Sequence, residues 1–280
     1  MINYYLLTKP GIIFGNLITV AAGFLLASKG NVDLSLFFAT LIGLAFVMAS
    51  SCVFNNYINR QDDKKMERTK NRALVTGLIS GRSAIVFGIC LGIIGNSILF
   101  LYTNLLTVMV ASIGFFVYVI LYSFWKCRTI YGTAIGSIAG ATPPVVGYCA
   151  VSNHFDMGAL ILFAIMVLWQ MPHFFAIAMY HLDDYTKAEI PVLPVKKGIL
   201  RTKIHMMVYI LCFVLTASML TFFNYTGYVY LIVTTSIGLT WLGFCLQGFK
   251  KDNDQLWGRL MFRLSLVMII ATSFLISFRM

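Results

Sequence analysis

Nine long apolar runs constrain this sequence more than any other feature. Each is about 17 to 25 residues long, the length that a helix needs to cross the hydrocarbon core of a bilayer. With 59% hydrophobic and 11% charged residues and a mean hydropathy of +0.84, most of the chain is suited to lipid rather than to water. The sequence therefore predicts an all-α, polytopic membrane protein, a bundle of nine transmembrane helices. The runs cover residues 11–28, 35–55, 83–102, 104–124, 131–151, 157–180, 203–223, 228–248 and 258–278.

The runs follow one another without a linker, a low-complexity segment or a convincing internal repeat, so we expect residues 1–280 to form a single domain. The first run follows only Lys9 and lacks a small-residue cleavage pattern, which favours a retained span over a removed signal peptide. The six cysteines stand singly, without CxxC spacing, as small packing residues do. A thiolate nucleophile at Cys127, between two basic residues, is the less favoured interpretation.

Basic residues orient the predicted bundle. All 21 Lys and Arg residues except Lys29 and Arg279 lie in the N-terminal segment, in the even-numbered loops or at the adjoining helix ends. The positive-inside rule then predicts a plasma (inner) membrane protein with a cytoplasmic N-terminus and an outside C-terminus. Both long loops, near residues 56–82 and 181–202, are expected in the cytoplasm. The net charge of +11 indicates anionic headgroups and an anionic substrate. Nothing resembles a nucleic-acid module, so we expect no nucleic-acid partner.

The first long loop carries an unusual density of charge. An Asp, Lys or Arg at the centre of a membrane helix costs roughly 2.5 to 3.5 kcal/mol, so this loop is expected at a water-accessible membrane edge. Four oxygen-bearing side chains recur at intervals of four residues: Asn55, Asn59, Asp63 and Glu67. On a continuous helix such residues share one face, and oxygen ligands on one face suit Mg²⁺. The alternative is a solvated basic loop with surface ion pairs.

The second long loop follows the sixth apolar run. Tyr180 and Asp184 follow His173 by seven and eleven residues. On a continuous helix the three side chains would lie within about 20° of one another around the axis. His173 would then lie roughly 15 Å deeper than Asp184, inside the membrane. An ionisable group at that depth indicates a ligand-binding or catalytic role. The alternative for His173 is an interhelical hydrogen bond.

The first loop resembles the Asp-rich signature of the UbiA-type intramembrane prenyltransferases. Seven residues match its fixed positions: Asn55, Asp63, Met66, Arg68, Thr69, Arg72 and Gly77. Two positions depart from it, because Asn59 stands where an Asp is expected and Asp62 stands where an apolar residue is expected. Asp62, three residues further on, is able to supply the carboxylate that Asn59 lacks. Which of the two contacts the metal is left open.

Further blocks resemble the branch of this family that acts on haem. They are TKPGIIFGN at 8–16, the segment 122–148, WQMPHF at 169–174 and DDYTKAEIPVLP at 183–194. The resemblance spans nearly the whole chain and implies a central cavity that opens toward the cytoplasmic side. It implies transfer of the farnesyl group of farnesyl diphosphate to a vinyl group of haem B, with addition of water, giving haem O and diphosphate. Haem B and farnesyl diphosphate are then substrates and Mg²⁺ is the cofactor. A terminal oxidase or haem-modifying enzyme as partner is left open.

The resemblance also implies roles for individual residues. The implied metal ligands are Asn55, Asn59, Asp62, Asp63, Asp183 and Asp184. The implied phosphate-binding residues are Arg68, Lys70, Arg72, Lys126 and Arg128. The aromatic faces of Tyr122, Phe174 and Tyr180 suit stabilisation of an allylic cation. His173 is expected to ligate haem iron or to orient the porphyrin. The expected catalytic residues are Asp63, Asp184, His173 and Tyr180.

Three alternative functions follow from the same features. A prenyltransferase for an aromatic acid or a quinone precursor would share both acidic loops. A secondary transporter would carry its polar residues in broken helices at the bilayer midplane, whereas the acidic residues here gather at one membrane face. A non-catalytic oxidase assembly factor would follow if Asn59 marks a lost metal site.

Overall fold

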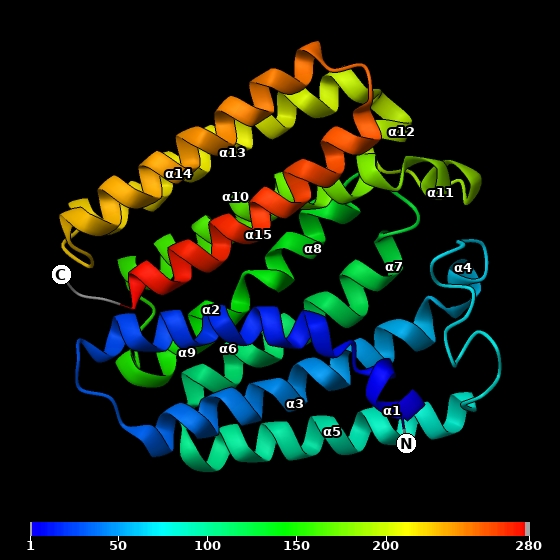
Figure 1. Cartoon of the computed structure of the whole chain (residues 1–280). Coiled ribbons are helices and arrows are strands. Elements are labelled where there is room, and N and C mark those ends of the chain that lie inside the picture. The colour runs from blue at the N-terminus through cyan, green and yellow to red at the C-terminus, as the bar shows by residue number, and fades with distance from the viewer. Residues whose placement is uncertain (1, 278–280) are drawn as a thin grey trace.

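The computed structural model describes residues 2–277, which form helices and connecting turns without a β-strand (Figure 1). The first half of the bundle contains α2 (Pro10–Ser28), α3 (Leu34–Ile58), α5 (Gly81–Tyr102), α6 (Leu105–Phe116), the π-helical turn η1 (Val117–Tyr122), α7 (Ser123–Trp125), α8 (Gly132–Gly140) and α9 (Thr142–Ser152). The second half contains α10 (Met157–Tyr180), α13 (Ile199–Phe222), α14 (Tyr228–Gln247), the 3₁₀ turn η2 (Gly248–Lys250) and α15 (Asp254–Ile276). Short helices α1 (Ile2–Leu7), α4 (Arg60–Asp63), α11 (Leu182–Lys187) and α12 (Leu193–Lys197) lie outside the spans.

Within the described residues, nine helical segments are long and apolar enough to cross a membrane. Each matches one predicted run, with ends that differ by no more than four residues. The prediction of an all-helical, nine-span protein is therefore confirmed. The end of the ninth predicted run, residue 278, and the outside charge of Arg279 lie beyond the described residues.

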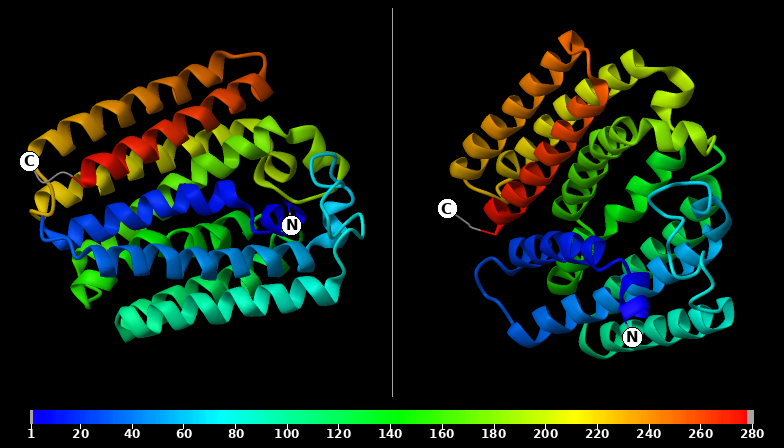
Figure 2. Two further views of the ribbon diagram at one scale, coloured as in Figure 1. Left: turned by 60° about the horizontal axis from the view of Figure 1, so that its bottom comes forward. Right: turned by 45° about the vertical axis from the view of Figure 1, so that its right-hand side comes forward.

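The helices pack as two neighbouring groups. In the first, α3 lies along α5 and α2 lies along α9; in the second, α10 contacts α13 and α15, and α14 contacts α13 and α15 (Figure 2). Contact between α15 and α2 joins the groups. The α2–α9 contact is unusually close, since a Cβ on Gly147 would lie 2.1 Å from the carbonyl oxygen of Val20. Small residues allow such backbone approach between membrane helices.

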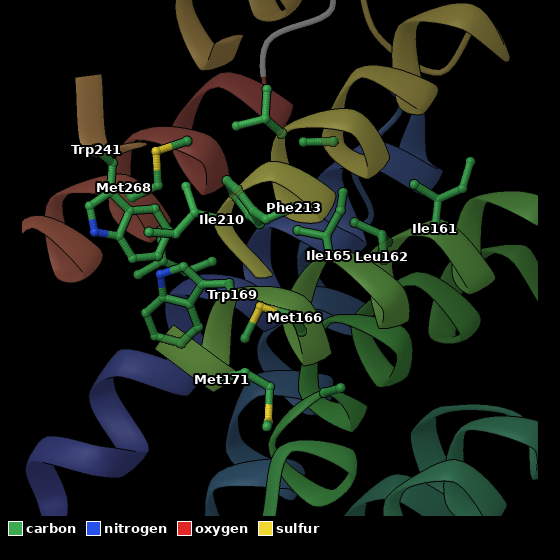
Figure 3. Packing of buried hydrophobic residues seen from close by; sticks show 14 of the residues in the cluster. Ile161, Leu162, Ile165, Met166, Trp169, Met171, Ile210, Phe213, Trp241 and Met268 are labelled. Carbon is green, nitrogen blue, oxygen red and sulfur yellow. The ribbon is translucent and has the colours of Figure 1, made fainter. Parts of the chain in front are cut away.

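The largest apolar cluster lies in the second group. Trp169 of α10, Ile210 of α13, Trp241 of α14 and Met268 of α15 are all buried and point toward one another (Figure 3). The outer faces instead expose large apolar side chains, as at Phe222, which is 73% exposed. Apolar surface on this scale is what a lipid environment requires. The core therefore fixes the four C-terminal helices as one unit.

Both acidic loops lie at the same end of the bundle. The turns around α4 and the segment with α11 and α12 sit beside each other there, together with α1, while α15 ends at the opposite side (Figures 1 and 2). This is the arrangement that the charge pattern predicted for loops on one membrane side. The assignment of that side to the cytoplasm stays a prediction.

Two predictions about helix continuity are wrong. Regular helix stops at Asp63, so Glu67 leaves the face that the four-residue spacing had assigned to it. Helix α10 stops at Tyr180, and His181 adopts a non-helical conformation with φ −107° and ψ 32°. Asp184 therefore lies on α11, and the continuous stripe with His173 does not form. Both breaks fall where the apolar pattern ends, because packing of an apolar face stabilises most helices.

Candidate functional site

Three predicted ligands of the first loop do share one face. The backbone N–H of Asn59 donates to the carbonyl of Asn55 at 3.0 Å, and that of Asp63 donates to the carbonyl of Asn59 at 2.9 Å. Helical hydrogen bonding thus continues across the boundary between α3 and α4, which preserves the register. All three side chains are nearly inaccessible, at 1%, 2% and 1% exposed for Asn55, Asn59 and Asp63. Asp62 lies beside them and is half-buried.

Asp63 has one carboxylate oxygen committed and one uncommitted. Its Oδ2 accepts a hydrogen bond of 2.6 Å from Arg72, which also donates to Asn56 Oδ1 at 3.1 Å. Its Oδ1 is buried and has no hydrogen-bond partner among the described residues. A buried carboxylate oxygen without a donor is costly. A hard cation such as Mg²⁺ would satisfy it, so the residues present fit the metal that the sequence predicts.

Asn55 is held by protein partners on both ends of its amide. Lys9 Nζ donates to Asn55 Oδ1 at 2.7 Å, and Asn55 Nδ2 donates to Ser123 Oγ at 2.9 Å. Neighbouring Asn56 donates to the carbonyl of Leu7 at 2.8 Å. The junction between α1 and α2 is therefore tied directly to the acidic face of α3.

A cavity of about 360 Å³ lies between the two acidic loops. It is lined by Glu67, Arg68, Tyr180, His181, Asp183 and Asp184. The first two come from one loop and the other four from the end of α10 and from α11, so the loops meet around a shared space. Arg68 donates to the Tyr185 hydroxyl at 2.8 Å, and Met66 packs in a small apolar cluster with Tyr185, Ala188 and Ile190.

The start of α15 contacts the second acidic loop. Arg259 lies 5.4 Å from the centre of the Tyr180 ring, and Gln255 donates to Asp183 Oδ2 at 2.9 Å. Burial, and then the charge of Arg68, lower the pKa of His181, while Asp184 opposes the shift. The net effect favours a neutral imidazole at His181. Asp184 is half-buried and Asp183 is exposed.

The remaining predicted phosphate-binding residues surround this region without lining the cavity. Lys126 lies 5.9 Å from the Tyr122 ring, and Arg128 lies 5.9 Å from the ring of Phe124. Lys70 forms an exposed ion pair with Glu67. Burial raises the pKa of Cys127 to about 11, which keeps the thiol protonated and removes the basis for a thiolate nucleophile there.

His173 lies apart from this cavity, and its ring is fixed by α15. Nδ1 lies 2.7 Å from Ser265 Oγ, and the Ser265 hydroxyl donates to the carbonyl of Phe262 at 2.6 Å. Because a hydroxyl has one proton to donate, Ser265 accepts from His173, which places the imidazole proton on Nδ1. The lone pair of Nε2 then remains for a ligand. The ring stacks on Trp169 at 4.8 Å, and Phe174 contacts its edge at 5.6 Å.

The described residues contain no cluster of three or more His, Cys, Asp or Glu side chains arranged to hold a metal ion. The first loop contributes Asp63 and the neighbouring amides, which do not line the cavity, and the second loop contributes Asp183 and Asp184, which do. Mg²⁺ usually joins one or two carboxylates to substrate phosphates and keeps several waters. The donor set therefore suits a metal that binds together with an anionic substrate.

Sequence reasoning missed three residues of this region. Lys9 is the one basic residue ahead of the first span. Its position directly before Pro10 was the sequence signal that could have identified it. His181 follows Tyr180 directly, and this neighbourhood to a predicted site residue was the available signal. Arg259 lies in the ninth span, and only the packing of α15 brings it to Tyr180.

Comparison with known proteins places these features in context. A family model described as the UbiA prenyltransferase family matches residues 16–267. The protoheme IX farnesyltransferase of Protochlamydia amoebophila (strain UWE25) is 63% identical over 279 residues, covering 99% of both chains. The protoheme IX farnesyltransferase of Serratia proteamaculans (strain 568) is 55% identical over 279 residues, covering 99% of this chain and 94% of that one.

Solved structures share the fold. A structure of digeranylgeranylglyceryl phosphate synthase gives a TM-score of 0.77 at 19% identity and covers 97% of both chains. A UbiA homolog from Archaeoglobus fulgidus bound to GPP and Mg²⁺ gives a TM-score of 0.67 at 19% identity, covering 98% of this chain and 99% of that one. At these identities the likeness establishes the architecture.

Proposed function

Because the chain belongs to the UbiA prenyltransferase family, we propose that it transfers the farnesyl group of farnesyl diphosphate to a vinyl group of haem B. Water adds in the same reaction, and haem O and diphosphate are the products. The observation that carries the site is the meeting of two acidic loops and Arg68 around one cavity at the loop end of the bundle. The choice of haem as acceptor follows from relatives that are 63% and 55% identical over almost the whole chain.

The reaction begins with an allylic C–O bond that breaks, leaving its electron pair on the diphosphate. Asp63 with Asn59 or Asp62 in the first loop, and Asp183 with Asp184 in the second, would hold Mg²⁺, which would supply counter-charge for the leaving diphosphate. Arg68 lines the cavity and would donate to non-bridging oxygens, as guanidinium groups do in phosphate recognition. Arg72 is paired with Asp63 and so holds that carboxylate in position.

The farnesyl carbon then forms a bond to the terminal vinyl carbon, and the positive charge moves to the vinyl carbon next to the porphyrin. Water supplies the hydroxyl group there and releases one proton. An apolar path for the prenyl chain among the spans would protect the first cation from early capture by water. The ring of Tyr180 lies at the cavity, where its face is suited to a passing cation. Tyr122 and Phe174 are proposed to line the path of the prenyl chain and the porphyrin.

We assign the loop end of the bundle to the cytoplasm. The basic residues concentrate there, in accordance with the positive-inside rule. A diphosphate is water-soluble whereas a farnesyl chain and haem B are membrane-soluble, so a site at the membrane edge serves all three. The proposed orientation places the active site at the cytoplasmic face.

The assay uses purified protein in lipid nanodiscs with Mg²⁺, haem B and farnesyl diphosphate, and detects haem O by chromatography and mass spectrometry. We expect haem O in the complete mixture and none when 4-hydroxybenzoate replaces haem B. Removal of Mg²⁺ with EDTA is expected to lower the rate by at least about 100-fold, because the leaving diphosphate loses its counter-charge. Excess Mg²⁺ should restore the rate. An unchanged rate in EDTA would contradict the metal assignment.

Replacement of His173 by Ala is expected to weaken haem B binding at least about tenfold and to change its Soret absorption. Nε2 is the unprotonated nitrogen of a ring whose Nδ1 is held by Ser265, and a hydrogen bond from the nitrogen that does not bind the metal is typical of metal-ligating histidines. Titration of haem B into nanodiscs, followed by absorption spectra, measures this without turnover. Ser218→Ala on α13 is the control. Identical spectra for wild type and His173→Ala would remove His173 from the haem site.

A further inference from the structure

Two arginines lie on the outward face of α15, within its membrane-spanning segment. Arg259 and Arg263 are both exposed and stand one helical turn apart. Arg263 is the tenth residue of this 23-residue helix, roughly 14 Å along the axis from its first residue and thus close to the middle of the span. Charged side chains at such a depth are rare, and they mark functional sites by default. Neither guanidinium takes part in the proposed reaction steps.

Neither arginine has an anionic partner within the protein. Among residues 2–277, neither side chain forms an ion pair or donates a hydrogen bond. Arg259 lies over the ring of Tyr180, with 5.4 Å between the guanidinium carbon and the ring centre. A contact with a ring face leaves the five N–H donors of a guanidinium uncommitted. The pair therefore presents two cations, with all their donors free, to a ligand inside the membrane.

Both arginines lie on the turns of α15 that hold the proposed haem ligand. The Phe262 ring lies 5.1 Å from the His173 ring, and Ser265 Oγ lies 2.7 Å from Nδ1 of the same imidazole. Arg263 stands between these two α15 residues in the sequence, and Arg259 lies one turn nearer the loop end. A porphyrin bound through His173 would therefore lie at the depth of the two guanidinium groups.

Haem B is the anionic substrate that matches this depth. It carries two propionate carboxylates on one edge of the porphyrin and two vinyl groups on the opposite edge. The charge of farnesyl diphosphate instead belongs to its diphosphate, which the acidic loops and their metal would hold at the loop end of the bundle. A guanidinium binds a carboxylate through paired N–H donors. Two such groups about 6 Å apart along a helix suit two neighbouring propionates.

We propose that Arg259 and Arg263 bind the propionates of haem B and thereby turn its vinyl edge toward the inside of the bundle. The inference rests on the proposed function and adds the orientation of the acceptor. Because both arginines are on the outward face of α15, the propionate edge lies at the lipid side of this helix. The opposite edge then faces the prenyl path, for which Tyr122 and Phe174 are the proposed lining residues.

The test compares the binding of haem B with that of haem B dimethyl ester, which keeps the iron and the vinyl groups but lacks the propionate charges. Phosphatidylcholine nanodiscs hold the protein, so no anionic headgroup competes, and absorption spectra record binding without turnover. Wild type is expected to bind haem B at least about tenfold more tightly than the ester. Arg259→Gln and Arg263→Gln should each reduce this preference, because haem B loses an ionic contact that the ester never makes. The double variant should abolish it.

Arg201→Gln is the matched control, because Arg201 is exposed near the loop end of α13 and should leave the preference unchanged. If Arg259→Gln fails to fold for lack of its contact with Tyr180, the Arg263→Gln measurement decides. Equal affinity of wild type for haem B and the ester, or an unchanged preference in the folded Gln variants, would overturn the inference. Variants altered only in binding of phosphatidylglycerol would overturn it as well, and would assign the pair to lipid headgroups. Absence of haem O formation by wild type would instead overturn the proposed function.

Discussion

Replacement of Asp63 by Asn is expected to lower the rate of farnesyl transfer by at least about 100-fold while the bundle stays folded. Asp63 is 1% exposed, and its Oδ1 is the one carboxylate oxygen among the described residues that is buried without any hydrogen-bond or ion-pair partner. Removal of one preorganised electrostatic group typically costs 10²- to 10³-fold in rate, or about 3 to 4 kcal/mol. Asparagine preserves the shape and the bond from Arg72, so the loss would report charge rather than packing.

The measurement is single-turnover formation of haem O at saturating substrates, with the thermal midpoint of each variant recorded alongside. Asp33→Asn is the matched control, since Asp33 caps the start of α3, the helix that precedes α4, and asparagine caps equally well. It should transfer farnesyl at the wild-type rate. A folded Asp63→Asn protein with near-normal turnover would remove Asp63 from the reaction.

The nine spans, and the gathering of both acidic loops at one end of the bundle, were predictable because they depend on average properties of the sequence. A run of about 20 apolar residues crosses a bilayer whichever neighbours it packs against. The acidic loops were likewise recognisable, because their residues stand close together in the sequence. The structure confirms nine spans and brings Glu67 and Arg68 of one loop to Asp183 and Asp184 of the other.

The details that escaped prediction depend on tertiary contacts. Spacing alone suggested that His173 and Asp184 share a stripe, but the helix breaks at His181, where no packed face continues. The tautomer of His173 depends on Ser265, which lies 92 residues away in the sequence. Lys9 looked like an ordinary flanking charge until the fold placed it against Asn55. No periodicity within one helix records contacts of this kind.

The two adjacent acids of α11 differ in their surroundings, and this difference predicts different effects on the reaction. Asp184 is half-buried beside Tyr180 and His181 at the cavity, whereas Asp183 is exposed and already accepts a hydrogen bond from Gln255. We expect Asp184→Asn to lower the transfer rate by at least about 100-fold, on the scale of one lost electrostatic group. Asp183→Asn is expected to cost about tenfold or less, because water competes at an exposed site.

The dependence of the rate on Mg²⁺ concentration separates a metal role of Asp184 from a structural one. If Asp184 holds the ion, Asp184→Asn should require several-fold more Mg²⁺ for its half-maximal rate, since one negative oxygen ligand is lost. Asp252→Asn, an exposed acid just before α15, should change neither the rate nor the Mg²⁺ requirement. A reduced rate with an unchanged Mg²⁺ requirement would indicate that Asp184 only supports the loop. If the rate no longer responds to Mg²⁺ in either Asp63→Asn or Asp184→Asn, neither acid alone retains the metal-bound substrate. That result would show that the two loops act on one metal-bound substrate.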